Sequence, residues 1–261
     1  MFDYNNLPLQ DFEGFSSSQM HQIIYFPFDD SCPIKLNRNI PVNESPIFMI
    51  ALDLLLLLKE NRIKLTKLGN IPTKIVKELY DKKNFTDSLV EKGLYKIRLE
   101  RDWLILHTVK IVLQLAGLTK KQREVLSLTK KGETLLNKED YTGLFFEFLK
   151  AYTQKFNWEY NDYIDVKNVG QLAFLYSLFL LNKYGSEYKL VDFYTDLYLK
   201  AFPIFLSQFE ESKIRFAYDA RFISKFAEWF GFAETKTDNS NDSLFGTTFI
   251  RSSNLLKAIM K

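Results

Sequence analysis

The segment most informative about the fold is GLTKKQREVLSLTKKGETLL, residues 117–136. We expect a helix to end at Gly117, because glycine is the common residue just past a helix C-terminus. A basic hairpin follows, and its second strand covers residues 125–128. Three cations lie at the expected tip: Lys120, Lys121 and Arg123. Thr129 then offers an N-cap for a closing helix. The segment therefore predicts helix, hairpin, strand and helix in close succession.

The composition favours helices over strands. The chain of 261 residues is long enough for one large or two small domains. It holds 24 Phe and 14 Tyr but only 10 Gly and 7 Pro. Because glycine and proline are the residues of tight turns, few of them favour long helices over a many-stranded sandwich. We expect a mainly α-helical protein whose aromatic residues fill the core.

The charge is distributed unevenly. Residues 59–138 carry 19 basic and 9 acidic side chains, whereas residues 1–58 carry 2 and 7. A basic segment of this kind is typical of a surface for the phosphate backbone of nucleic acid. Alternatively, it is a lysine-rich solvated surface that pairs with acidic neighbours in the same fold. The sequence leaves both interpretations open.

The sequence predicts further helices on both sides of the hairpin. Upstream, Ser45 as N-cap and Pro46 at the first position open an apolar helix that runs to about residue 61. We expect the other upstream elements to be a strand at 63–66 and helices at 72–83 and 100–116. Downstream, we expect helices at about 140–157, 168–183 and 188–209, the last kinked by Pro203.

The end of the chain repeats the pattern of residues 117–136. A helix at 218–230 stops at Gly231, and a polar turn at 238–243 takes the place of the hairpin tip. A strand at 245–250 then leads to a helix capped by Ser252 or Ser253. This echo indicates two hairpin-bearing modules joined by a helical middle region.

Residues 117–136 resemble the wing and last helix of bacterial winged-helix regulators. The matching residues are Gly117, Leu118, Leu126, Ser127, Leu128, Thr129, Gly132, Leu135 and Leu136. The chain also resembles an uncharacterised group of bacterial proteins through residues 11–28 and 69–80, from which no activity transfers. The first resemblance implies a mainly α fold with winged-helix-like modules, whose small β-hairpin wings pack on a helical middle region.

With that resemblance, we expect four segments. They are an irregular N-terminal segment with a short helix at 1–46, a winged-helix-like module at 47–138, a helical region at 139–213 and a candidate second module at 214–261.

The helix before the hairpin departs from the regulators' pattern. In regulators, this recognition helix directs polar residues at base edges. Here it is RDWLILHTVKIVLQLAG, residues 101–117, which is apolar on most faces and therefore suited to burial. If nucleic acid is bound, phosphate contacts would dominate and sequence readout would be poor. The candidate binding residues are Lys120, Lys121, Arg123, Lys130, Lys131, Arg101 and Lys110.

No motif assigns a reaction, a metal or a cofactor. The two histidines, His21 and His107, lack a second ligand at helical spacing, and His107 reads as a satisfied core histidine. The single cysteine, Cys32, excludes an internal disulfide framework. Phosphate-binding glycine loops are absent. We expect no cofactor, no metal site and no catalytic residue.

The sequence therefore predicts a binding protein rather than an enzyme. The first hypothesis is contact with DNA through the basic module, without sequence preference. The second is a protein-interaction scaffold or dimerisation module with no nucleic-acid binding, and the third is an enzyme with an unrecognised site. The N-terminus lacks an apolar signal region and the apolar runs are too short for a bilayer, so we expect a cytoplasmic protein without a membrane partner.

Overall fold

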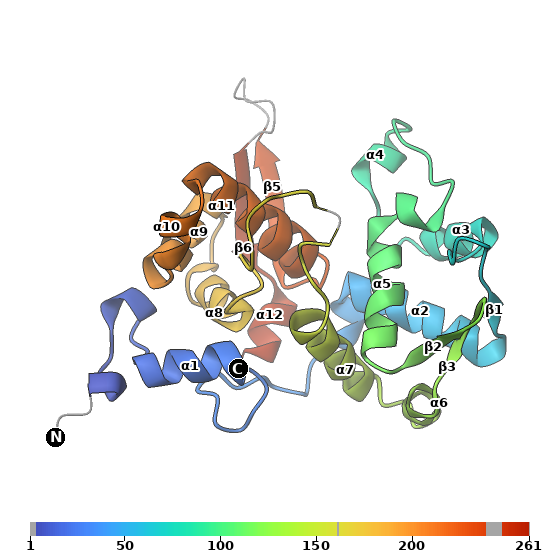
Figure 1. The fold of residues 1–261 in the computed structure, drawn as a ribbon, viewed down its shortest axis with the longest axis horizontal. Helices are drawn as coiled ribbons and strands as arrows, with labels where there is room; N and C mark the ends of the chain where they lie inside the picture. Colours follow the sequence, from blue (N-terminus) through green and yellow to red (C-terminus); the bar gives the residue numbers. More distant parts are fainter. Residues whose placement is uncertain (1–3, 161, 239–246, 261) are drawn as a thin grey trace. The chain divides into compact units, whose positions relative to one another are not determined.

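The computed structural model describes residues 4–160, 162–238 and 247–260 (Figure 1). The chain separates into two compact units, which we call the middle unit, residues 41–157, and the terminal unit, residues 1–40 with 158–261. The described residues are mainly helical with two small three-stranded antiparallel sheets, which confirms the expected fold class at that level. Except for Asp238, the expected polar turn at 238–243 lies outside the described residues.

The middle unit alternates helices with a small sheet. Its elements are a 3-10 turn (Val42–Glu44), α2 (Pro46–Glu60), β1 (Ile63–Lys64), α3 (Thr73–Asp81), α4 (Ser88–Glu91), a 3-10 turn (Glu100–Asp102), α5 (Leu104–Leu115), β2 (Thr119–Gln122), β3 (Val125–Leu128), α6 (Lys130–Asn137) and α7 (Tyr141–Gln154). The strands lie in the order β1-β3-β2, and all pairs are antiparallel.

The apolar helix α2 forms the centre of this unit and packs on α5. Pro46 lies in its first turn, as expected, whereas the Ser45 side chain occupies the cap position without making a capping hydrogen bond. The one charged residue inside its apolar run, Asp53, is buried and accepts hydrogen bonds from Lys82 (2.8 Å) and Asn84 (2.6 Å). Helix α5 also packs on α7, so it has neighbours on more than one side.

The hairpin β2–β3 forms where the sequence predicts it, but Lys120 and Lys121 lie within β2 and not at the tip, because the strand continues to Gln122. Gly117 ends α5 with φ 69°, and Arg123 at the turn has φ 57°. The Thr129 hydroxyl accepts a hydrogen bond from the Gly132 amide (3.2 Å), which confirms the expected N-cap of α6. A Cβ added to Gly132 would lie 2.3 Å from the Leu118 carbonyl oxygen, so α6 can approach the hairpin this closely only with glycine here.

The terminal unit has more helices around a second sheet. Its elements are 3-10 turns (Tyr4–Asn6 and Gln10–Phe12), α1 (Ser17–Tyr25), α8 (Phe174–Tyr184), β4 (Lys189–Leu190), α9 (Val191–Ala201), α10 (Ile204–Gln208), α11 (Glu211–Tyr218), a π-helical segment (Asp219–Glu228), β5 (Ala233–Asp238), β6 (Thr247–Ser252) and α12 (Asn254–Ile259).

Two helix predictions in this unit need correction. The helix expected at 188–209 is two helices, because Pro203 has no N–H to continue the ladder and the chain breaks between α9 and α10. The helix expected at 168–183 begins only at Phe174, since Gly170 (φ 83°) and Ala173 (φ 56°) adopt left-handed conformations. The Ser253 hydroxyl caps α12, as one of the two expected candidates.

The two units repeat one backbone arrangement. The terminal sheet has the order β4-β6-β5, which corresponds to β1-β3-β2, and each sheet follows a helix and ends in a capped helix. The amide of Thr129 donates to the Leu118 carbonyl (3.0 Å), as that of Ser253 does to Phe232 (3.0 Å). Gly231 has φ 73°, close to that of Gly117. The strand registers of the two hairpins therefore show which residue of one hairpin occupies the same position as a given residue of the other.

A buried arginine holds the terminal unit together. Arg221, on the π-helical segment, has no exposed surface, and its guanidinium donates to Asp162 (2.6 and 3.3 Å). It also donates to the carbonyls of Val166 (2.6 Å) and Ile164 (3.1 Å). The Asp162 side chain is 4% exposed. One side chain therefore fixes the irregular segment that precedes α8.

Replacing Arg221 should destabilise this unit. Arg221→Met leaves the Asp162 carboxylate buried without its partner, which costs about 3–5 kcal/mol of unfolding free energy. Urea unfolding followed by tryptophan fluorescence in a Trp103→Phe background, which leaves Trp158 and Trp229, measures the change. Arg251→Met removes an arginine whose ion pair is 41% and 46% exposed and should leave the transition unchanged. Equal midpoints for the two variants would contradict the role given to Arg221.

Candidate functional site

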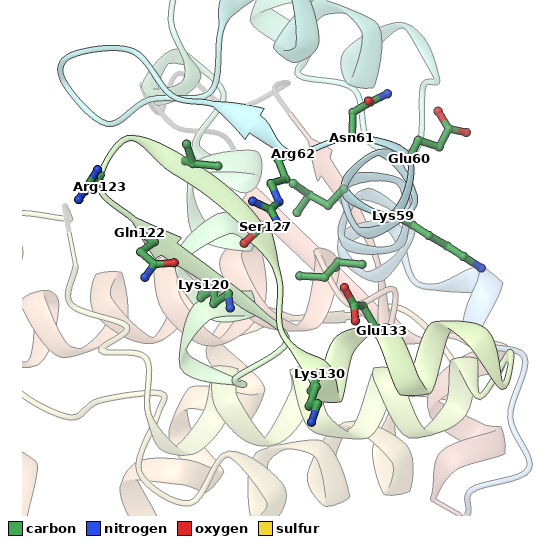
Figure 2. A pocket seen from close by; sticks show the side chains of 13 residues that line it. Lys59, Glu60, Asn61, Arg62, Lys120, Gln122, Arg123, Ser127, Lys130 and Glu133 are labelled. Atoms are coloured by element: carbon green, nitrogen blue, oxygen red, sulfur yellow. The ribbon is translucent and has the colours of Figure 1, made fainter.

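A groove of about 660 Å³ lies in the middle unit beside the hairpin (Figure 2). It is bounded by the end of α2, the chain entering β1, the hairpin β2–β3 and the start of α6. We call it the basic groove. Its lining residues are Leu58, Lys59, Glu60, Asn61, Arg62, Lys120, Gln122, Arg123, Val125, Ser127, Leu128, Lys130 and Glu133.

Five of the lining side chains are cations: Lys59, Arg62, Lys120, Arg123 and Lys130. All five are exposed, and within the described part of the chain none has a side-chain hydrogen bond or an ion pair. Two carboxylates, Glu60 and Glu133, share the groove. An excess of cations without internal partners in a concave surface produces a positive potential that attracts anions.

The alternation of the strand decides which hairpin cations reach the groove. Lys120 pairs opposite Ser127, and both side chains belong to the groove face, whereas Lys121 pairs opposite the buried Leu126. Because neighbouring strand residues point to opposite faces, Lys121 lies on the other side. There its ammonium covers Gly69, where an added Cβ would be 2.9 Å from Nζ.

The structure brings three of the seven predicted binding residues together in the groove: Lys120, Arg123 and Lys130. Lys121 faces away from it. Lys131 donates to Glu147 (2.6 Å) and to the Ala116 carbonyl (3.1 Å). Arg101 is exposed in the turn before α5 and does not line the groove.

The last predicted residue, Lys110, is buried with a carboxylate. Its Nζ lies 2.5 Å from Oε1 of Glu100, a residue with no exposed surface, and donates to the Gly69 carbonyl (2.9 Å). Nδ1 of His107 lies 2.5 Å from the same oxygen, and the Ile71 amide donates to Oε2 (2.5 Å). His107 is thus the satisfied core histidine that the sequence predicts, and Lys110 is held in the interior.

The environment of Glu100 favours its charged form. Burial raises the pKa of this carboxyl, but hydrogen bonds from His107 and Lys110 and from the Ile71 amide outweigh burial. The pKa is therefore lower than its usual 4.5. The cluster connects α5 to the segment that precedes α3. The side chains of His107 and Lys110, at the centre of α5, are both bound to Glu100 and so face the interior.

Two groove cations were not predicted from the sequence. Lys59 lies in the last turn of α2, and Arg62 immediately precedes β1. Both reach the groove because β1 pairs with β3, which brings residues 59–62 beside the hairpin. Lys59 and Arg62 could have been predicted only by inferring that residues 63–66 pair antiparallel with residues 125–128.

The equivalent surface of the terminal unit has lost its free cations. The register makes Glu234 the counterpart of Lys120, and Arg251 the counterpart of Ser127. These two residues pair with each other (2.5 Å), and the ring of Tyr188 lies under Arg251 (4.8 Å) and Lys236 (4.1 Å). The same backbone therefore carries a surface here on which Arg251 is neutralised by Glu234 and Lys236 lies against an aromatic ring.

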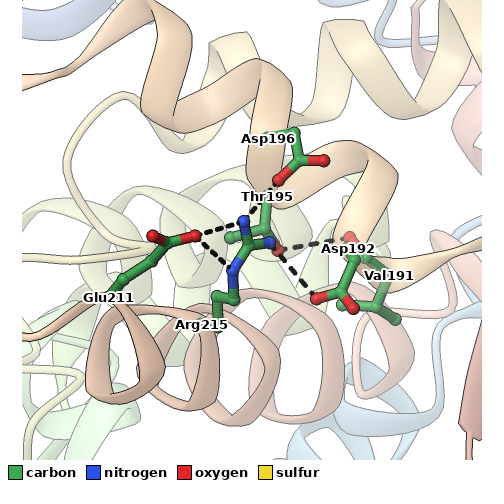
Figure 3. A network of polar contacts seen from close by, with 6 residues as sticks. All are labelled: Val191, Asp192, Thr195, Asp196, Glu211 and Arg215. Carbon is green, nitrogen blue, oxygen red and sulfur yellow. Dashed lines mark hydrogen bonds and ion pairs between the residues drawn. The ribbon is translucent and has the colours of Figure 1, made fainter. Parts of the chain in front are cut away.

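The helix before the second hairpin shows the same neutralisation (Figure 3). Arg215 on α11 contacts Asp196 (2.6 Å), Glu211 (2.6 Å) and Asp192 (3.4 Å). Burial lowers the pKa of Arg215, but these carboxylates outweigh burial and raise it above its usual value. The network joins α9 to α11 and leaves an excess of negative charge around the guanidinium.

The remaining site predictions concern metals and membranes. Among the described residues, no group of three or more His, Cys, Asp or Glu side chains is placed to hold a metal ion. Within the same residues, every helix is too short or too polar to cross a bilayer.

Comparison with known proteins gives one match. A family model described as the Y4jL N-terminal domain matches residues 43–141, which lie within the middle unit and include the whole basic groove. That part of the chain is similar to this domain, whose description names no ligand and no activity. Neither the curated proteins nor the solved structures contain a match.

The lowered pKa of Glu100 predicts an acid-dependent loss of stability. Its contribution is complete above pH 4.5, the usual value, and is lost as the pH falls through the lower pKa of the folded state. In Glu100→Gln this part of the pH dependence should disappear, and the variant should be less stable by about 3 kcal/mol because Lys110 is buried without its carboxylate.

Urea unfolding between about pH 3 and pH 6, followed by the fluorescence of Trp103 in a Trp158→Phe/Trp229→Phe background, measures this dependence. Glu78→Gln, at an exposed position of α3, is the matched control and should keep the wild-type slope. An unchanged slope in Glu100→Gln would contradict the account of the cluster.

Proposed function

We propose that this protein is a non-enzymatic nucleic-acid-binding protein and that its middle unit is a winged-helix-like module. The element order supports the module proposal: a helix, a strand, then α3, the short α4 and α5, and then the hairpin, with sheet order β1-β3-β2. In that frame β2–β3 is the wing and α5 holds the place of the recognition helix. The terminal unit, from α8 to α12, would be a second module of the same kind.

The observation that carries the proposal is the set of five cations around the basic groove. Some other cations of the middle unit are paired within the fold, as Lys110 is with Glu100 and Lys131 with Glu147. Cations that lack internal partners repel one another until a polyanion binds. Lysine and arginine contacts to phosphates release condensed counterions, which is the main source of non-specific nucleic-acid affinity.

The same geometry supports backbone contact over base readout. A recognition helix needs exposed polar residues to reach base edges. Helix α5 has most of its residues buried, and its inward polar residues His107 and Lys110 are bound to Glu100. The proposed binding therefore has little sequence preference.

A protein-interaction scaffold is the second candidate. It is supported by exposed apolar side chains in the middle unit, Leu68 at 80% and Leu94 at 74%. The terminal unit supports it as well, since the surface equivalent to the basic groove is neutralised by the pair of Glu234 and Arg251. In this alternative the basic groove would receive an acidic segment of a protein.

Removing groove cations should weaken DNA binding and flatten its salt dependence. In Arg62→Ala/Lys120→Ala/Arg123→Ala, the slope of log affinity against log salt should fall in magnitude by about 3, one unit for each lost phosphate contact. Fluorescence anisotropy with a labelled DNA duplex at several salt concentrations measures the slope.

The matched control is Lys74→Ala/Lys77→Ala/Lys138→Ala, which removes the same charge from exposed positions of the middle unit outside the groove. It should keep nearly the wild-type slope. Equal losses in the two triple variants would mean that net charge, and not the groove, determines binding. Absence of binding at low salt would contradict the proposed function and favour the scaffold.

A further inference from the structure

We infer that the ligand of the basic groove is a nucleic-acid duplex in preference to a single strand, bound through its phosphates on the outer face of the hairpin β2–β3. This inference rests on the proposed function and specifies its substrate class. Three features of the groove carry it: the kinds of side chain that line it, the placement of its cations and the burial of α5.

The lining contains no aromatic side chain on which unpaired bases can stack. Its apolar residues are the aliphatic Leu58, Val125 and Leu128, and its other members are charged or carry amide or hydroxyl groups. Proteins that bind single strands without sequence preference combine a basic groove with aromatic side chains, and each stacked base contributes about 1–3 kcal/mol. In a groove without aromatic residues, stacking on aromatic rings adds nothing to the affinity for a single strand, and the contacts to phosphates remain.

Three of the five cations are arranged as a row. Figure 2 shows Arg123, Lys120 and Lys130 following one another from the hairpin tip to the start of α6, with Glu60 and Glu133 on the side of α2 and α6. Lys120 lies in β2 and Arg123 lies three residues later at the turn, so their Cα atoms are at most about 10 Å apart. Over about 10 Å of axis a duplex presents roughly six negative charges and a single strand about half as many.

A winged-helix protein usually reads bases with exposed polar residues of its recognition helix. Most residues of α5, which holds that place here, are buried. On the opposite face of the sheet Leu126 is buried, and Lys121 is placed over Gly69. The outer face therefore holds the concentrated free cations, and a duplex that lies on it contacts the protein through its backbone alone. Binding should then be insensitive to base sequence.

The test uses the full chain with a labelled duplex of roughly 20 base pairs, one of its strands alone and a duplex of scrambled sequence, in fluorescence anisotropy at equal salt. We expect the duplex to bind at least about tenfold more tightly than the strand, and the scrambled duplex to bind within about twofold. Lys120→Ala/Lys130→Ala should lose most of the preference for the duplex.

Two control variants probe other surfaces. Arg101→Ala/Gln114→Ala alters the side of α5, and Lys236→Ala/Arg251→Ala removes cations at the positions equivalent to Gln122 and Ser127. Both should bind the duplex as the wild type does. Circular dichroism confirms that each variant is folded.

The outcomes separate this inference from the proposed function. Equal or tighter binding of the single strand, a strong effect of scrambling, or a loss in Arg101→Ala/Gln114→Ala as large as in the groove variant would overturn the inference while nucleic-acid binding stands. Failure of every probe to bind at low salt would overturn the proposed function itself.

Discussion

The buried carboxylate of Glu100 is the interaction on which the surface of the middle unit depends. A carboxylate without solvent is costly by several kcal/mol unless donors surround it, and here they come from His107, Lys110 and the Ile71 amide. Because His107 and Lys110 bind Glu100, these polar residues of α5 face the interior. The hydrogen bond from the Ile71 amide connects the cluster to the chain before α3. Helix α5 is thereby committed to the core, between α2 and α7. The hairpin β2–β3 presents Lys120 and Arg123 to solvent, and its outer face forms one groove with residues 59–62.

The repeat shows how one backbone carries two different surfaces. Both sheets have the same strand order, and both hairpins follow a left-handed glycine and precede a capped helix. These features depend on backbone hydrogen bonds and on a few residues, namely the glycines and the helix caps. Most other side chains of the two hairpins can therefore differ without changing the backbone arrangement. At the outer face the change is decisive, because Lys120 of the middle unit corresponds to Glu234, which pairs with Arg251. Of the two equivalent surfaces, the one in the middle unit retains cations that a polyanion could neutralise.

The sequence predicted those features that depend on local chemistry. Gly117, the basic hairpin and the Thr129 cap follow from backbone preferences, and the burial of His107 follows from its apolar helix. The burial of Lys110 could not be predicted, because its partner is a carboxylate ten residues away whose burial depends on tertiary packing. Lys121 was misplaced because the face of a strand residue depends on register, which the pairing with β3 fixes. Arg62 and Lys59 were missed because they reach the groove through the long-range pairing of β1 with β3.

The most direct test of the central claim is hydrogen–deuterium exchange of the full chain with and without a DNA duplex at low salt. We predict added protection in residues 58–62 and 119–130, which surround the basic groove, and none in segments 184–188 and 233–236 of the terminal unit, which the strand register makes equivalent to 58–62 and 119–122. Protection centred on the Arg101 end of α5 or on the terminal hairpin, with residues 119–130 unchanged, would contradict it.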